Sequence, residues 1–209
     1  MKFARIREAD KKFTRMLDQT RADQQSGDPV KAEHALVAEL IFLTGIRPGS
    51  DEDTGAEKKA FGATTLQARH IVAKNDEDVR LQFTGKKGVD LDLPIYDETL
   101  KQKLVQRVAV KKADERLFKI SDESLRDYVR TLDGGDFKPK DIRTALGTRM
   151  ARKAMKSLPT PTNPKDYKSA VMEVGKRVSK ILGNTPSVAL ASYIDPTLFV
   201  EWKTKAGIE

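Results

Sequence analysis

The feature that most restricts the fold is one stretch of alternating apolar and polar residues set among helical patterns. The segments VRLQF (79–83) and VDLDLPI (89–95) alternate with a period of two on either side of TGKKG. Alternation around a glycine-containing turn is typical of a β-hairpin. The preceding segment QARHIVAK, residues 67–74, is predicted to add a third strand. The chain should therefore contain one small antiparallel sheet.

The rest of the chain has helical periodicity, with apolar residues three and four positions apart. The most apolar helix is predicted at residues 30–44 and ends at TGIRPGS, because Gly45, Pro48 and Gly49 break the pattern. The predicted fold class is mainly α (α+β), a helical domain with a small antiparallel sheet. The other predicted helices are residues 2–25, 97–111, 121–132, 138–157 and 164–182, with a short one after Pro196.

Two segments have the composition of linkers, SLPTPTNP (157–164) and DGGDFKP (133–139). Neither divides the chain into halves with separate cores, and a length of 209 residues is close to the usual size of one domain. We expect residues 1–209 to form a single domain that begins with a helix within residues 1–26.

Composition excludes several kinds of site. The sequence has no cysteine, which rules out disulfides, thiol nucleophiles and cysteine-based metal sites. The most apolar run, ALVAELIFL, is far shorter than the ~20 apolar residues of a membrane-spanning helix. The segment MKFARIREADKKF lacks the apolar core of a secretion signal. We therefore expect a cytoplasmic protein with no membrane partner.

Positive charge is concentrated in the second half of the chain. Residues 101–209 carry 23 Lys and Arg against 13 Asp and Glu, whereas residues 1–100 carry 16 against 18. Such an excess is typical of proteins that bind a polyanion, because cationic side chains that neutralise phosphates release counterions. Charge alone fits equally well a basic soluble protein that has no such partner.

Four side chains of chemical interest lie where the helical pattern breaks. Arg47 follows the most apolar helix, Lys86 lies at the hairpin tip, and Arg143 lies near a helix start. Tyr193 lies among small residues that should leave it accessible. Loops anchored on rigid elements often carry functional groups. Each residue also has a structural alternative, because such cations are commonly solvated or capping and such a tyrosine commonly packs in the core.

Taken in order, these segments resemble the catalytic domain of type IB DNA topoisomerases, most closely the small bacterial and poxvirus-like group. The resemblance covers residues 29–205 and implies that the β-rich domain preceding the catalytic one in that group is absent here. Five segments carry the resemblance. TGIRPGS contains the match to the family's first arginine, GATTLQARHI (62–71) matches its Gly-x-Thr-Thr-Leu stretch and the histidine that follows, and FTGKKG (83–88) contains the match to its hairpin lysine. KDIRTALGT (140–148) contains the match to the second arginine, and SYIDP (192–196) contains the match to the nucleophilic tyrosine.

The resemblance implies a role for each of five catalytic residues. Tyr193 attacks a DNA phosphodiester to form a 3′-phosphotyrosyl link, and Lys86 protonates the departing 5′-oxygen. Arg47 and Arg143 bind the non-bridging oxygens, where planar guanidiniums stabilise developing charge. Asn184 stands where many members have histidine. Its amide can donate a hydrogen bond to the phosphate but cannot exchange a proton.

Four further residues are expected to contact DNA. Arg69 and His70, on the predicted third strand, are candidates for a phosphate or base edge, although a partly buried structural role is an equal alternative for His70. Lys138 and Lys140 flank the second arginine motif and are expected to contact phosphates.

The predicted function is that of a type IB DNA topoisomerase, which breaks one strand, relaxes supercoils and reseals without ATP or metal. The sequence has no P-loop pattern and no cluster with metal-ligand spacing, so no cofactor is expected. The expected protein is a DNA-associated monomer on double-stranded DNA. One alternative is a tyrosine recombinase or integrase, which usually carries His-x-x-Arg where this chain has Lys140 to Arg143. Another is a non-catalytic basic DNA-binding module.

Overall fold

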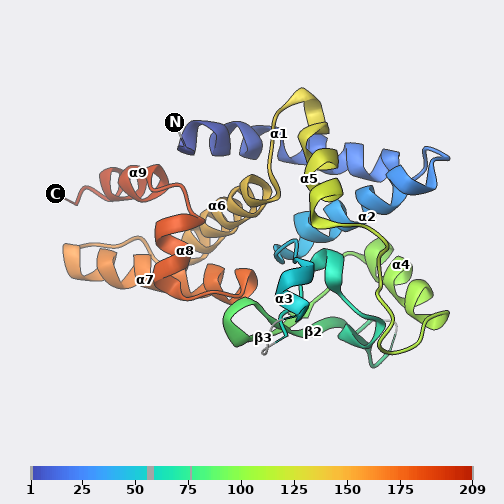
Figure 1. The fold of residues 1–209 in the computed structure, drawn as a ribbon. Helices are drawn as coiled ribbons and strands as arrows, with labels where there is room; N and C mark the ends of the chain where they lie inside the picture. The colour runs from blue at the N-terminus through green and yellow to red at the C-terminus, as the bar shows by residue number, and fades with distance from the viewer. Residues whose placement is uncertain (1, 56–58, 76, 209) are drawn as a thin grey trace. The chain divides into compact units, whose positions relative to one another are not determined.

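The computed structural model describes residues 2–55, 59–75 and 77–208. The chain divides into two compact units: unit 1 comprises residues 1–13 and 140–209, and unit 2 comprises residues 14–139. The described residues form nine α-helices and one three-stranded sheet (Figure 1). This confirms the mainly α class with a small antiparallel sheet. That residues 1–209 act as one catalytic domain stays a prediction.

Unit 2 is built around the apolar helix α2 (Pro29–Thr44). The carboxylate of Asp28 caps its start by accepting hydrogen bonds from the main chain of Val30 and Lys31, and Gly45 ends it in the left-handed conformation with φ 69°. Most of the second half of α2 is buried, as its apolar sequence requires. The other helices of this unit are the later part of α1 (Lys2–Asp23), α3 (Asp51–Gly55), α4 (Glu98–Ala109) and α5 (Asp122–Arg130).

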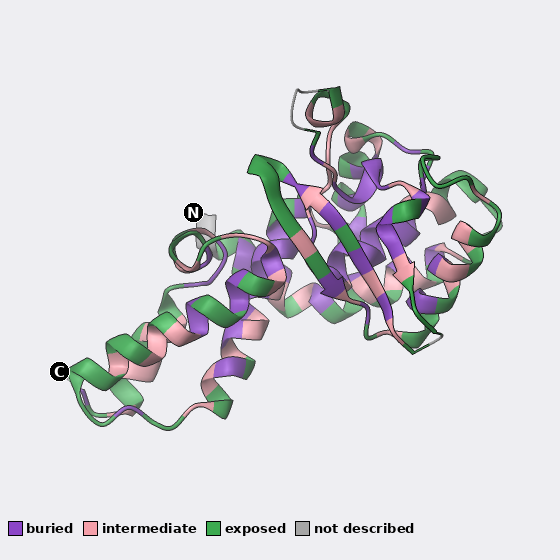
Figure 2. Cartoon of the chain, turned by 90° about the horizontal axis from the view of Figure 1, so that it is seen from below, coloured by how far each residue is buried: buried purple, intermediate pink, exposed green. Residues whose placement is uncertain are grey.

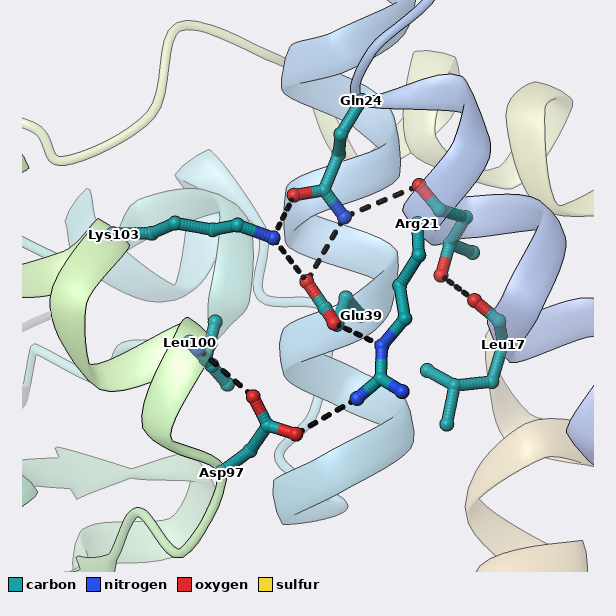
Figure 3. Close-up of polar contacts among 8 residues, drawn as sticks. Leu17, Arg21, Gln24, Glu39, Asp97, Leu100 and Lys103 are labelled. Carbon is teal, nitrogen blue, oxygen red and sulfur yellow. Dashed lines mark hydrogen bonds and ion pairs between the residues drawn. The ribbon is translucent and has the colours of Figure 1, made fainter.

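A buried carboxylate joins three of these helices (Figure 3). Glu39 on α2 is fully buried, and its oxygens accept hydrogen bonds from Arg21 at 2.8 Å, Gln24 at 2.9 Å and Lys103 at 3.2 Å. Arg21 also pairs with Asp97, the N-cap of α4. A buried charge is tolerated only when it is paired and hydrogen-bonded, so this cluster fixes α1, α2 and α4 in one arrangement.

The sheet of unit 2 contains β1 (Ile71–Ala73), β2 (Val79–Gly85) and β3 (Val89–Pro94), antiparallel in that order. Alternate residues of β2 are buried, which gives the banding visible in Figure 2 and agrees with the predicted hairpin. The predicted third strand is shorter than expected, because Ala68–His70 form a 3₁₀ turn instead of extended chain. Arg69 and His70 therefore lie on this turn and not on a strand, which corrects the prediction.

Unit 1 contains the start of α1 and four later helices. Its core includes Tyr193 and Ile194 together with buried residues of the preceding helices. The helix α8 begins with the cap Thr185 and Pro186 and was not predicted. The four helices are α6 (Pro139–Ser157), whose first residue belongs to unit 2, α7 (Pro164–Leu182), α8 (Pro186–Ser192) and α9 (Thr197–Lys205).

The core of unit 1 is formed by Ala151, Ala154, Val174, Val178, Leu182, Ala189, Tyr193 and Ile194. None of the helices in the described part of the chain combines the length and apolar character needed to cross a membrane.

Candidate active site

The predicted nucleophile and the second arginine are in direct contact within unit 1. Arg143, on the second turn of α6, donates a hydrogen bond from Nη1 to the Tyr193 hydroxyl oxygen at 2.9 Å. Its guanidinium carbon also lies 4.8 Å from the centre of the Tyr193 ring, in cation–π range. The Nη2 atom donates to the carbonyl oxygen of Leu182 at 3.1 Å. A cation placed this way stabilises negative charge that develops on the phenol oxygen.

Tyr193 is buried, which corrects the expectation that small neighbours leave it accessible. Only 5% of the residue is exposed, and Arg143 is 3% exposed. Tyr193 is the residue that ends α8, where its backbone N–H donates to Ala189. The small residues Ala191 and Ser192 do precede it, but packing on the core of unit 1 decides its burial. In the free protein the phenol therefore lies against Arg143 and not in solvent.

The helix α6 fits closely against the main chain that follows α8. A Cβ atom added to Gly147 would lie 2.4 Å from the carbonyl oxygen of Tyr193, so only glycine fits there. The next residue, Thr148, accepts a hydrogen bond at Oγ1 from the backbone N–H of Asp195 at 3.1 Å. Arg143 and Gly147 are one helical turn apart and share a face of α6. This face therefore sets the position of the segment that contains Tyr193 and Asp195.

Asp195 anchors the other end of the same segment. Its buried carboxylate accepts hydrogen bonds from the backbone N–H and hydroxyl of Thr197 and forms an ion pair with Arg7 at 3.4 Å. These bonds fix the turn between Tyr193 and α9. The segment SYIDP is thus held at its aspartate as well as at its tyrosine.

Asn184 has an unusual environment. Within the described part of the chain, it is the residue whose side-chain amide nitrogen and oxygen are both buried with no hydrogen-bond partner. It follows Gly183, which ends α7 in the left-handed conformation at φ 60°. A buried amide without a partner is energetically costly, and a bound ligand can satisfy it. Asn184 lies two residues after Leu182, whose carbonyl oxygen Arg143 contacts.

In unit 2 the Arg47 loop is locked onto the GATT segment. The carbonyl oxygens of Arg47 and Pro48 accept hydrogen bonds from the backbone N–H groups of Ala63 at 2.8 Å and Thr64 at 2.7 Å. A Cβ atom added to Gly62 would lie 2.5 Å from the backbone nitrogen of Gly49. The two loops therefore touch backbone to backbone, and the glycines of both motifs make this contact possible.

Arg47 itself is partly exposed, and its guanidinium has no partner among residues 2–55, 59–75 and 77–208. A guanidinium remains charged at any physiological pH, so it is free to bind an anion. Lys86 lies in the turn Lys86–Gly88 between β2 and β3, as predicted for the hairpin tip, and its side chain is 52% exposed. The turn requires a left-handed Lys87, with φ 67°.

The four predicted DNA contacts differ in accessibility. Arg69 is exposed and forms an ion pair with Asp114 at 2.8 Å. His70 is buried beside Phe61 at a ring distance of 4.4 Å, and Nδ1 accepts from the backbone N–H of Gln67. Burial, reinforced by the charge of Arg69, lowers the pKa of His70 to about 4. Its geometry fits the structural alternative, and a DNA contact stays a prediction.

Lys138 and Lys140 are both exposed on either side of Pro139, where α6 begins. Exposed cations at this position agree with a phosphate contact, which stays a prediction. No group of three or more His, Cys, Asp or Glu with metal-binding geometry occurs in the ranges that the structure describes.

The family model for the catalytic core of eukaryotic DNA topoisomerase I matches residues 1–197 of this chain. The chain belongs to this topoisomerase family. A similar protein is the DNA topoisomerase 1B of Acanthamoeba polyphaga mimivirus, 24% identical over 200 residues. The match covers 84% of this chain and 59% of that topoisomerase. The resemblance to type IB topoisomerases inferred from the motifs is therefore confirmed.

Several residues with structural roles in the candidate site had no role assigned from the sequence. Gly147 and Thr148 lie inside the quoted motif KDIRTALGT, and Gly62 lies inside GATTLQARHI. Glycines inside otherwise periodic or functional segments are the signal that could have found them, because such a glycine commonly marks a close backbone approach. The partner of each glycine could not be read from its position.

Proposed function

We propose that this chain catalyses transient single-strand cleavage and resealing of double-stranded DNA as a type IB topoisomerase, with Tyr193 as nucleophile. The observation that carries the proposal is the buried contact of Arg143 Nη1 with the Tyr193 hydroxyl oxygen at 2.9 Å. Any buried tyrosine hydroxyl needs a hydrogen-bond partner, but this partner is a cation, which favours the negative charge that the phenol oxygen carries during attack. Family membership supports the same activity.

In the proposed reaction the Tyr193 oxygen attacks the phosphorus and its proton passes to solvent. The bond from phosphorus to the 5′-oxygen breaks, and Lys86 gives that oxygen a proton, so a 3′-phosphotyrosyl ester and a 5′-hydroxyl result. Arg47, Arg143 and Asn184 donate to the non-bridging oxygens. Resealing is the reverse reaction, and the ester retains the energy that it needs.

The residues assigned to the proposed reaction are divided between the two units. Unit 1 carries Tyr193, Arg143 and Asn184, and unit 2 carries Arg47 and Lys86. The amide of Asn184 and the guanidinium of Arg47 have no hydrogen-bond partner among the described residues, so both are available to bind a phosphate. No step in this scheme consumes ATP or calls for a metal, since side-chain cations stabilise the charge.

The distribution of charge also supports a DNA substrate. Unit 1 carries 18 Lys and Arg against 8 Asp and Glu, whereas unit 2 carries 21 against 23. The whole positive excess thus belongs to the unit that holds Tyr193. Cationic side chains near the nucleophile would bind phosphates and make affinity strongly dependent on salt.

Covalent trapping tests the proposal. Purified protein is mixed with a nicked duplex that loses the 5′ leaving strand after cleavage, and products are separated on a denaturing gel. Wild type should form a protein–DNA adduct that Tyr193→Phe abolishes. Tyr96→Phe is the matched control, because Tyr96 is 84% exposed and, within the described part of the chain, its hydroxyl is not hydrogen-bonded to a guanidinium as that of Tyr193 is.

Relaxation of a plasmid separates the remaining alternatives. A topoisomerase should relax supercoiled DNA as a monomer without a specific site, whereas a recombinase should require an assembled complex and exchange strands. Failure of wild type to form any adduct would favour the non-catalytic DNA-binding module.

A further inference from the structure

The hairpin lysine of unit 2 is held by a single carboxylate. Lys86 Nζ lies 3.3 Å from Oδ1 and 3.5 Å from Oδ2 of Asp53, on the short helix α3. Asp53 is less exposed than Lys86, with 29% of its side chain accessible against 52%. The lysine is therefore the more accessible partner of the pair.

Asp53 is bonded to the Arg47 loop. Its Oδ2 accepts a hydrogen bond from Ser50 Oγ at 2.9 Å, and its backbone N–H donates back to the same hydroxyl at 3.3 Å. Ser50 is the third residue after Arg47, within TGIRPGS. A continuous chain of bonds thus runs from the Arg47 loop through Ser50 and Asp53 to Lys86.

A second set of bonds links the same parts of unit 2. The backbone carbonyl of Asp53 accepts from Ala60 at 2.9 Å, and the next residue, Phe61, donates to the carbonyl oxygen of Thr84 at 2.9 Å. Thr84 lies on β2, two residues before Lys86. The hairpin tip and the Arg47 loop are therefore joined by main-chain bonds as well as by the ion pair.

The neighbouring acidic residues of α3 do not share this role. Asp51 pairs with Arg116 at 2.9 Å, and Glu52 is exposed. Asp51 and Asp53 thus carry the same charge on the same helix and contact different cations. This difference provides a matched control.

We propose that Asp53 is a positioning residue that holds the Lys86 ammonium in place relative to Arg47 for protonation of the leaving oxygen. The proposal rests on the proposed function, in which Lys86 is the general acid. Exposed ion pairs are weak, so Lys86 can leave Asp53 for the DNA oxygen at small cost. Loss of Asp53 should therefore slow cleavage modestly, by about two- to five-fold, while binding of DNA is unchanged.

The test compares two leaving groups. Single-turnover cleavage is measured on a duplex with the normal bridging 5′-oxygen and on one with sulfur in its place. A thiolate leaves without protonation, because thiols are far more acidic than alcohols. Asp53→Ala should slow cleavage of the oxygen substrate and leave the sulfur substrate at the wild-type rate. Asp51→Ala should match wild type on both.

Two further measurements complete the test. Lys86→Ala should lower the cleavage rate of the oxygen substrate much more than Asp53→Ala does, and the sulfur substrate should restore the rate. Asp53→Ala should have no added effect on the cleavage rate in the Lys86→Ala background. Asp53→Asn, which keeps an acceptor for Ser50, guards against misfolding and should lie between wild type and Asp53→Ala.

Each failure has its own signature. Equal slowing of both substrates by Asp53→Ala, or no slowing of either, would overturn the positioning role while leaving the general acid intact. A Lys86→Ala defect that sulfur does not restore would overturn the assignment of Lys86 and the role of Asp53 with it. Absence of any wild-type adduct on both substrates would overturn the proposed function itself.

Discussion

A methyl group on Gly147 would lie 2.4 Å from the carbonyl oxygen of Tyr193, so this residue of α6 packs directly against the main chain of the tyrosine. Elsewhere in a helix, Gly→Ala stabilises by about 1 kcal/mol. Here the overlap should outweigh that gain, because forced overpacking costs about 1–3 kcal/mol. The same helix face carries Arg143, so displacement of either chain disturbs their contact.

We predict that Gly147→Ala lowers both the melting temperature and the rate of covalent adduct formation. The expected loss of rate is on the order of 100-fold, since a displacement of about 1 Å has that effect in a preorganised site. The control is Gly55→Ala on α3, where an added Cβ meets nothing within 4 Å. A Gly147→Ala protein with raised stability and full activity would contradict the close contact.

Asn184→Ala should separate stability from catalysis. Because neither amide atom has a partner in the free protein, its removal should leave the free energy of unfolding unchanged or raise it by about 1–3 kcal/mol. Cleavage should fall by about 100-fold through loss of a phosphate donor. Asn184→His should restore much of the rate, since the imidazole can donate in its place. Denaturant unfolding and single-turnover cleavage measure the two effects, and a loss of stability above about 2 kcal/mol would reveal a structural partner.

Arg143→Lys should be a severe change despite conservation of charge. A single ammonium cannot bond both the Tyr193 hydroxyl and the Leu182 carbonyl while lying over the tyrosine ring. We predict a loss of cleavage rate of about 100-fold.

Arg149→Lys is the matched control for Arg143→Lys. Arg149 lies on the same helix, stacks 4.9 Å from the Phe13 ring centre and pairs with Asp10, so it shares the helix and the ring contact of Arg143, although its side chain is 41% exposed. Its replacement should leave adduct formation within a few-fold of wild type. Equal losses for both variants would indicate an effect on α6 as a whole.

His70 predicts a specific dependence of stability on pH. Its pKa is lowered by burial to about 4, so the folded protein keeps it neutral where the unfolded chain, with a value of 6.5, takes up a proton. Protonation of His70 in the unfolded chain therefore lowers the free energy of unfolding as the pH falls from about 6.5 towards 4. At pH 5 the expected loss from this residue is about 2 kcal/mol relative to neutral pH.

The measurement compares wild type with His70→Gln in denaturant unfolding at pH 7 and pH 5. The variant lacks the titrating group, so the difference in unfolding free energy between the two proteins should shrink at the lower pH. An unchanged difference would show that His70 does not remain neutral in the folded state.

The helices and strands whose apolar residues recur with a regular spacing were predictable from the sequence. The helix α2 and the hairpin of β2 and β3 have apolar residues at the spacing that their burial requires, and Gly45 marks where α2 ends. The third strand was predicted too long because His70 bonds back to Gln67 and turns the chain. That local bond competes with strand pairing, and periodicity contains no information about it.

The environment of Tyr193, the proposed nucleophile, was harder to predict. The helix α8 has only seven residues, too few for a periodic signal, although Thr185 and Pro186 are a readable start. The motifs identified which residues to examine, but burial of Tyr193 depends on α6, about 50 positions away. The Lys86–Asp53 pair likewise joins residues 33 positions apart, so its detection required the folded structure.

The burial of Tyr193 also governs how the free protein meets chemical modification. Nitrating and iodinating reagents, and kinases that phosphorylate tyrosine, act on phenols that project into water. Tyr96, with 84% of its surface exposed, is such a target, whereas Tyr193 is shielded at 5%. In the free protein Tyr193 is therefore protected from such reagents, and a labelling time course with and without DNA would show whether DNA changes that protection.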